Sequence, residues 1–208
     1  MTQSVQPSSQ TKSVSRYLPS SLYLDSAYYE WLTTVSSDLS LAVVRAPAAT
    51  QQLHEEIVQL LTLEARLLDQ RAYNVWIDLF TQECIYWIPA THPAMDPRST
   101  ITLEFHDRRR VLDRVDRLGT GLAYSQLPAS NTSRQFSGVE VWPSPKCDDE
   151  WRVRCSFALV ESRQGRNRTL AGWNGFVLRR EAGSLKIVLK QINLVDSDYP
   201  QGNNSFFL

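Results

Sequence analysis

The sequence predicts an α+β fold in which helices come first and a long, mainly antiparallel sheet follows. Between residues 51 and 81, apolar side chains recur at steps of three and four, which is typical of helices packed on a core. Beyond residue 120, apolar and polar residues alternate in several runs, which is the period of a strand with one buried face. A block of helices before a block of strands favours helices laid against a sheet, in one domain over residues 51–208.

Residues 1–50 are expected to form an N-terminal arm with two parts. Residues 1–20 are rich in Ser, Gln, Thr and Pro and contain no acidic residue, so they bury too little apolar surface to stay ordered alone. Residues 21–46 are richer in aromatic and aliphatic side chains, among them Tyr28, Tyr29, Trp31 and Leu32. We therefore expect the arm to be disordered at its start and to pack on the domain or on a neighbour after about residue 21.

The helical part of the domain contains three predicted segments and two short strands. Residues 51–81 predict two helices or one bent helix. Residues 83–90 form a β-rich run halted at Pro89, and residues 101–105 alternate as a second strand. Residues 106–121 then carry five arginines and three aspartates around an apolar stripe, which predicts an amphipathic helix ended by Gly119. On that helix Asp113 lies four residues from both Arg109 and Arg117, so the three charges can pair along the surface.

Four strands are predicted in the second half of the chain. They cover residues 134–142, 151–159, 169–180 and 185–195, and residues 181–184 form a hairpin-like turn between the last two. The final residues, Phe206, Phe207 and Leu208, are apolar and are expected to be docked on the domain.

Composition excludes several classes of partner and compartment. Lys plus Arg equals Asp plus Glu at 22 each, so no net field favours nucleic acid or an anionic membrane surface. Three cysteines at irregular spacing do not predict a disulfide framework or a structural zinc site, and no apolar run approaches the roughly 20 residues of a membrane-spanning helix. We therefore expect a cytoplasmic protein without nucleic-acid or membrane partners.

Residues for catalysis are sparse. His54, His92 and His106 are scattered, no cysteine has a histidine two residues away, and no G-x-S-x-G motif is present. The sequence thus predicts no metal, cofactor or catalytic site in this chain. Asp69, Tyr73, Tyr86 and Asp107 could act as acids or bases if a curved sheet enclosed them in a pocket.

Five segments, in this order, resemble the small (β) subunit of aromatic-ring-hydroxylating dioxygenases. They are EARLLD at 64–69, YWIP at 86–89, HDRRRVLDRVDRLGTG at 106–121, SQLPAS at 125–130 and KQINLVDSD at 190–198, and the resemblance covers roughly residues 58–208. It implies a cone-shaped, nuclear-transport-factor-2-like (cystatin-like) fold with helices on a strongly curved mixed sheet. The chain departs from the family pattern at Phe105, His106 and Asp107, where an aromatic residue followed by two acids is more common, and at Gly138, where Asn is frequent.

The resemblance also implies a role and partners. It implies a structural subunit of a multicomponent dioxygenase, with the Rieske [2Fe–2S] cluster and the mononuclear Fe(II) on the large (α) subunit, and an α3β3 hexamer with β–β contacts in a trimer. The charged helix and neighbouring anchors are the expected interface, since buried aromatics and arginines concentrate interface energy. The candidate interface residues are Trp87, Arg98, Arg108, Arg109, Asp113, Arg117, Arg134, Trp142, Phe206 and Phe207.

Two other functions remain open from sequence. One is a stand-alone isomerase or dehydratase of the same fold that uses Asp69, Tyr86 or another pocket acid or base. The other is a scaffold that binds only copies of itself.

Overall fold

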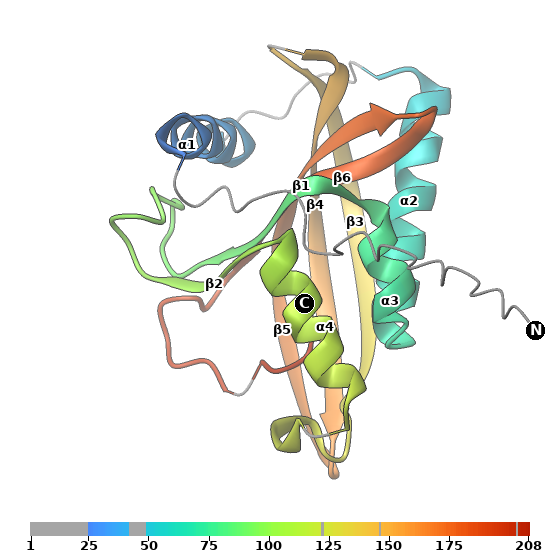
Figure 1. Ribbon diagram of the computed structural model, residues 1–208, viewed down its shortest axis with the longest axis vertical. Coiled ribbons are helices and arrows are strands. Elements are labelled where there is room, and N and C mark those ends of the chain that lie inside the picture. The colour runs from blue at the N-terminus through green and yellow to red at the C-terminus, as the bar shows by residue number, and fades with distance from the viewer. Residues whose placement is uncertain (1–24, 42–48, 122, 146, 203) are drawn as a thin grey trace, which may run out of the picture.

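The computed structural model describes residues 25–41, 49–121, 123–145, 147–202 and 204–208 (Figure 1). The predicted disordered start of the arm lies outside the described residues. The helices are α1 (Ser26–Ser40), α2 (Gln51–Asp69), α3 (Tyr73–Trp76) and α4 (Arg108–Gly119), with short 3-10 turns at Ile77–Leu79 and Tyr124–Gln126. The strands are β1 (Phe80–Pro89), β2 (Thr102–Asp107), β3 (Asn131–Ser144), β4 (Cys147–Arg163), β5 (Arg166–Glu181) and β6 (Ser184–Leu194).

The six strands form one mixed sheet in the order β2-β1-β6-β5-β4-β3. Strands β3 to β6 form an antiparallel meander, and β6 then pairs in parallel with β1, which pairs antiparallel with β2. The single parallel pair joins the sequence-distant β1 and β6, and so attaches the helical half of the chain to the meander. The predicted α+β class and the predicted strands are confirmed. The strong curvature implied by the resemblance stays a prediction.

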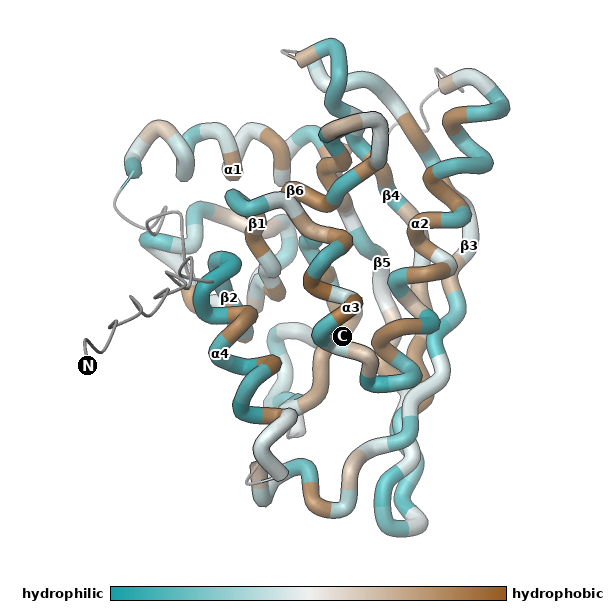
Figure 2. Tube along the Cα trace, turned by 45° about the vertical axis from the view of Figure 1, so that its right-hand side comes forward, coloured by the Kyte–Doolittle hydropathy of each residue, from teal (hydrophilic) through white to brown (hydrophobic). Residues whose placement is uncertain are grey.

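Helices α2, α3 and α4 cover one face of the sheet, which we call the inner face (Figures 1 and 2). Helix α2 starts at Thr50, whose hydroxyl accepts a hydrogen bond from the backbone N–H of Leu53 at 3.2 Å. It then presents a buried stripe of Ile57, Leu61, Glu64, Leu67 and Leu68. The stripe packs with α3 and with Val111, Leu112 and Val115 of α4 in one continuous core.

Helix α1 covers the opposite, outer face of the sheet. Its buried side chains Leu32, Val35 and Leu39 pack against Trp87, Trp142 and Leu189. Along β1, Tyr86 belongs to the inner core and Trp87 to the outer one. Because both faces are covered, residues 84–89 are all buried, which is why the sequence reads there as a continuous apolar run. Residues 26–40 of the arm thus pack on the sheet as α1, and the division of the chain into an arm and a domain stays a prediction.

The charged helix α4 begins at Arg108, directly after Asp107, the last residue of β2. Asp107 caps it by accepting a hydrogen bond from the backbone N–H of Arg110 at 3.0 Å. The prediction that the helix ends at Gly119 is confirmed, because Gly119 is the last helical residue, and Gly121 two residues later has a positive φ of +70°. Of these two glycines Gly121 adopts the left-handed backbone, which a residue without a Cβ can do at little cost.

Candidate functional site

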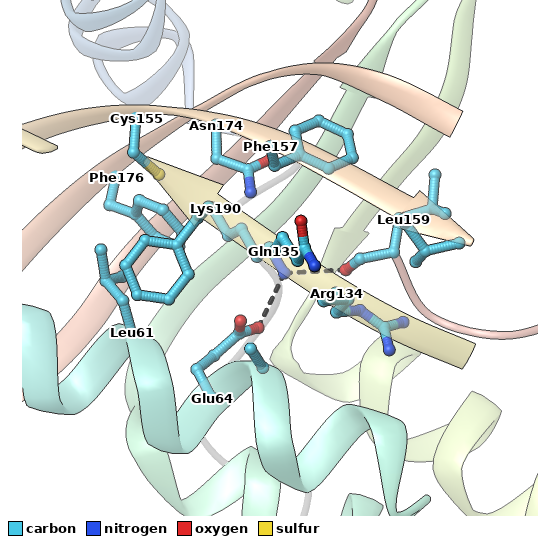
Figure 3. A pocket seen from close by; sticks show the side chains of 13 residues that line it. Leu61, Glu64, Arg134, Gln135, Cys155, Phe157, Leu159, Asn174, Phe176 and Lys190 are labelled. Carbon is cyan, nitrogen blue, oxygen red and sulfur yellow. Dashed lines mark hydrogen bonds and ion pairs between the residues drawn. The ribbon is translucent and has the colours of Figure 1, made fainter. Parts of the chain in front are cut away.

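The space between α2 and the inner face of the sheet contains a small cavity (Figure 3). Its volume, measured as the space open to the centre of a water molecule, is about 20 Å³, which is room for about one water. The lining residues come from α2, β3, β4, β5, β6 and the end of the chain: Leu61, Glu64, Ala65, Arg134, Gln135, Phe136, Cys155, Phe157, Leu159, Asn174, Phe176, Lys190 and Leu208. A cavity of this size cannot hold an arene or a cyclic ketone.

A buried ion pair crosses the cavity. Figure 3 shows Glu64 rising from α2 toward Lys190 of β6, and the Lys190 Nζ lies 2.7 Å from the Glu64 Oε1. The same carboxylate oxygen accepts a hydrogen bond from Trp76 Nε1 at 2.9 Å. Burial lowers the pKa of Lys190, and the adjacent Glu64 carboxylate opposes that shift. The pair therefore keeps two charges in the core by satisfying each with the other and with further hydrogen bonds.

Residues 204–208 close the inner face beside this pair. Phe206, Phe207 and Leu208 are 3%, 0% and 3% exposed, so the prediction that these residues dock on the domain is confirmed. The Phe207 ring packs against Trp76, with 4.7 Å between ring centroids, and against Tyr73 at 5.4 Å.

The four acid and base candidates are engaged in the chain's own structure, and none lines the cavity. Asp69 is ion-paired with Arg134 and accepts a hydrogen bond from Thr132 Oγ1 at 2.9 Å. The hydroxyl of Tyr86 accepts a hydrogen bond from the backbone N–H of Leu208 at 2.8 Å, and burial raises its pKa well above the usual value. Burial also raises the pKa of Tyr73, and Asp107 caps α4. The structure does not bring these residues together as an acid and base pair.

The charged helix divides its arginines between two directions. Arg108 and Arg114 turn toward the protein. Arg108 Nη1 donates to the carbonyl oxygens of Ile77, Phe80 and Thr81 at 3.0, 3.3 and 3.2 Å. Arg114 is ion-paired with Glu104, and its Nη2 also reaches two backbone carbonyls of residues 204–208.

The other face of the helix is exposed to solvent. Arg109, Asp113 and Arg117 are exposed and form no ion pair with one another in the part of the chain that the structure describes. The pairing predicted along this surface is therefore absent. Three charged side chains remain available to contacts outside the chain.

The ten candidate interface residues fall into three groups. Arg98, Arg109, Asp113 and Arg117 are exposed, and Arg108 is half-buried. Trp87, Trp142, Phe206 and Phe207 are at most 6% exposed, and the Arg134 side chain is 8% exposed. The five buried residues belong to the cores and ion pairs of this chain, so they can affect an interface only by supporting the residues at the surface. Whether a partner covers the exposed residues stays a prediction.

Polar side chains from the outer face of the sheet and from the loop before β2 contact α1. Trp142 Nε1 donates to Asp38 Oδ2 at 2.9 Å, and the Arg98 guanidinium lies 4.7 Å from the centre of the Tyr29 ring. Arg154 donates to the carbonyl oxygen of Leu39 at 2.6 Å. These contacts, together with the apolar cluster, fix α1 on the sheet.

Sequence reasoning missed Glu64, Lys190 and Arg114, although each has a signal. Glu64 falls within the apolar stripe of α2, Lys190 directly follows the apolar residues 187–189 of β6, and Arg114 adjoins the apolar stripe of α4. A charged residue at a position that the period assigns to the core predicts a buried partner. The partner itself is not visible in the sequence, because it comes from another element.

The histidines do not converge. His54 contacts the carbonyl oxygen of Val139 at 3.2 Å, and His92 contacts that of Leu194 at 2.5 Å. Burial and the nearby Arg114 and Arg110 lower the pKa of His106 to about 4. Within the described ranges, no group of three or more His, Cys, Asp or Glu residues could hold a metal ion, and no helix is long and apolar enough to cross a membrane.

Comparison with known sequences assigns the family. The sequence model described as "Ring hydroxylating beta subunit" matches residues 63–200. The chain belongs to the ring-hydroxylating β-subunit family. It is 30% identical over 156 residues, or 74% of this chain and 86% of the relative, to the small oxygenase component of the p-cumate 2,3-dioxygenase system of Pseudomonas putida. It is 31% identical to the 2-halobenzoate 1,2-dioxygenase small subunit of Burkholderia cepacia over 67% of this chain and 86% of the relative.

Solved structures give the same fold to this β subunit. The β subunit of the benzoate 1,2-dioxygenase from Burkholderia mallei superposes with a TM-score of 0.59 and 23% identity, covering 73% of this chain and 95% of that one. A chain of a naphthalene 1,2-dioxygenase crystallised with indole superposes with a TM-score of 0.67 and 20% identity, covering 77% and 88%. The implied nuclear-transport-factor-2-like fold is thereby confirmed.

Proposed function

We propose that this chain is the small, non-catalytic subunit of a multicomponent aromatic-ring-hydroxylating dioxygenase. It assembles with a large subunit that carries the Rieske [2Fe–2S] cluster and the mononuclear iron and that hydroxylates the arene. The observation that carries the proposal is the match of residues 63–200 to the β-subunit family.

The state of the inner face agrees with a structural role. The cavity has room for about one water molecule. Of the charged groups that line it, Glu64 and Lys190 are ion-paired at 2.7 Å and Arg134 is ion-paired with Asp69. Tyr86 is hydrogen-bonded to Leu208. Groups held in this way are not available to move a proton on a substrate, which disfavours the stand-alone isomerase or dehydratase.

The exposed face of α4 is the surface we assign to assembly. Arg109, Asp113 and Arg117 are solvent-exposed in the single chain, and Arg98 lies exposed on the loop that precedes β2. Charges of this kind contribute to register and partner choice more reliably than to affinity, because desolvation offsets much of their attraction. The stoichiometry we propose is α3β3, with β–β contacts in a trimer.

Co-expression tests the proposal. The chain is produced alone and together with a Rieske-type large subunit, and the mass, iron content and arene turnover of each product are measured. We expect a stable hetero-oligomer with the mass of three large and three small subunits, and iron and turnover only in that assembly. A chain that never associates with a large subunit would refute the structural role, and turnover of a cyclic ketone by the chain alone would favour the isomerase.

A further inference from the structure

Residues 204–208 are held on the inner face by side chains and not by a strand ladder. Arg114 Nη2 donates to the carbonyl oxygens of Asn204 and Phe206 at 2.8 and 2.7 Å. Arg134 Nη2 donates to the carbonyl oxygen of Phe207, and Lys190 Nζ donates to that of Leu208 at 2.7 Å. Four of the five carbonyl groups are therefore bound by cationic side chains, and these bonds are of the strong, charge-assisted kind.

The donors come from different parts of the fold. Arg114 lies on α4, Arg134 on β3 and Lys190 on β6, while Tyr86 of β1 bonds both the N–H and the carbonyl of Leu208, at 2.8 and 3.2 Å. In Figure 1 the end of the chain lies among α3, α4 and the sheet. A set of convergent donors on a preformed framework, closed around an extended segment, has the construction of a peptide-binding site.

A pocket for one aromatic ring accompanies the donors. Phe207 is fully buried, and its ring lies 4.7 Å from Trp76, 5.6 Å from Tyr86 and 4.3 Å from the Arg114 guanidinium. The ring thus sits among aromatic faces with a cation on one side, which is the arrangement of a binding anchor.

We propose that the inner face of this subunit is a binding site for an extended peptide with an aromatic anchor, and that residues 204–208 occupy it as a ligand carried on the same chain. Arg114, Arg134 and Lys190 bind the main-chain carbonyl groups of the peptide. The pocket formed by Trp76 and Tyr86 binds the aromatic ring at position 207. The segment that leads to the site, residues 195–202, is largely exposed, so the occupant is tethered by a surface connection. This inference does not depend on the role in a dioxygenase.

Cutting the tether tests the site in the full chain. A protease recognition sequence is inserted between Pro200 and Gln201, where the chain is exposed or half-buried. After cleavage, a labelled synthetic peptide of residues 201–208 is added, and its exchange with the retained segment is followed by fluorescence anisotropy. A second peptide has Ala in place of Phe207. A third, the matched control, has Ala in place of Ser205, a half-buried residue whose hydroxyl donates a hydrogen bond to Ser125 Oγ at 2.8 Å.

We expect saturable exchange of the native peptide into a folded, cleaved chain. Removing the Phe207 ring should weaken binding about thirtyfold or more, as for an aromatic hot spot, whereas the Ser205→Ala peptide should bind within about threefold of the native one. The absence of saturable binding, equal binding of the first two peptides, or unfolding of the chain on cleavage would each overturn the proposal, since the segment would then be an inseparable part of the core.

An uncut variant gives an independent readout. Phe207→Ala in the full chain should bind benzene in the vacated pocket, with a rise in Tm on addition of benzene. Phe105→Ala, which removes a half-buried ring on the outer side of the sheet, should show no such rise. A Phe207→Ala chain that does not respond to benzene would show that no preformed ring pocket exists.

Discussion

Replacing Glu64 by Gln isolates the electrostatic part of the buried pair. Glutamine keeps an oxygen that can accept the hydrogen bond from Trp76 Nε1, but it removes the charge 2.7 Å from Lys190 Nζ. Lys190 is 1% exposed, so its ammonium would remain buried without a counter-charge. Removal of one partner of such a pair costs about 3 to 5 kcal/mol of unfolding free energy.

The titration of Lys190 sets an upper limit on the electrostatic part of this loss of unfolding free energy and predicts its pH dependence. The mutant can escape the unpaired charge by deprotonating Lys190, and at pH 7 this costs about 5 kcal/mol, because each pH unit below the unfolded pKa of about 10.4 is worth about 1.4 kcal/mol. The part of the loss that comes from the unpaired charge therefore cannot exceed about 5 kcal/mol. A lysine whose folded pKa is lowered binds fewer protons in the folded than in the unfolded state, so stability rises with pH between those two pKa values. The mutant should recover part of its loss between pH 7 and pH 9.

Urea denaturation followed by tryptophan fluorescence measures both quantities. Asp96→Asn is the matched control, because it breaks an ion pair with Arg98 in which the arginine side chain is 44% exposed, and should cost at most about 1 kcal/mol. The double variant Glu64→Gln with Lys190→Met should regain at least half of the loss, since no charge is then left buried. A loss of less than about 1 kcal/mol, or a double variant no more stable than the single one, would refute this account of the pair.

Three further substitutions test other parts of the structure. Arg109→Glu should reduce co-purification with the large subunit while changing the unfolding free energy of the chain by at most about 1 kcal/mol. The control is Arg66→Glu, which changes an exposed arginine on α2, and equal effects of both variants would show that α4 is not part of the interface. The pKa of His106 is about 4 in the folded chain, so between pH 6.5 and 4 the unfolded chain is protonated there and the folded chain is not. The free energy of unfolding therefore falls as pH falls through this range. After allowance for partial exposure the change is about 1 to 2 kcal/mol, and His106→Gln should flatten that part of a Tm against pH curve; an unchanged slope would contradict the shifted pKa. Gly172→Ala would place a Cβ 1.9 Å from the carbonyl oxygen of Asn193 and should cost about 2 to 3 kcal/mol in thermal unfolding, whereas Gly119→Ala, with nothing within 4 Å, should be neutral or stabilising by up to about 1 kcal/mol; a neutral Gly172→Ala would show that β5 and β6 can separate there.

Local patterns predicted the elements well where one period and one environment coincide. The stripe of α2 and the alternation of Val153, Cys155 and Leu159 on β4 follow their periods, since each element has one face on the inner core. The parallel pairing of β1 with β6 could not be predicted in this way, because its residues, such as Tyr86 and Lys190, are about a hundred positions apart. Periodicity describes one element and contains no information on its neighbour.

The candidate interface shows the same limit for side chains. Trp87 and Trp142 were selected as aromatic anchors, yet α1 covers both. The sequence alone does not distinguish an aromatic residue that contacts a partner subunit from one that packs against a helix of the same chain, because both roles use the same residue types. What separates them is whether the chain contains another segment with a matching apolar stripe, and here Leu32, Val35 and Leu39 supply it.

The two directions of the arginines on α4 explain how one helix can serve both the fold and the assembly. The inward pair, Arg108 and Arg114, binds main-chain carbonyls of the segment around residue 80 and of residues 204–208, so the helix is fixed by bonds that a partner need not supply. The backbone that carries the outward Arg109 and Arg117 is then ordered before association, so only their side chains lose freedom on binding, which lowers the entropic cost. Substitutions on the inward face should consequently change the stability of the chain first, and those on the outward face its assembly first. A charged helix whose arginines all lay outward would gain more contacts with a partner, but it would have no comparable attachment to its own domain.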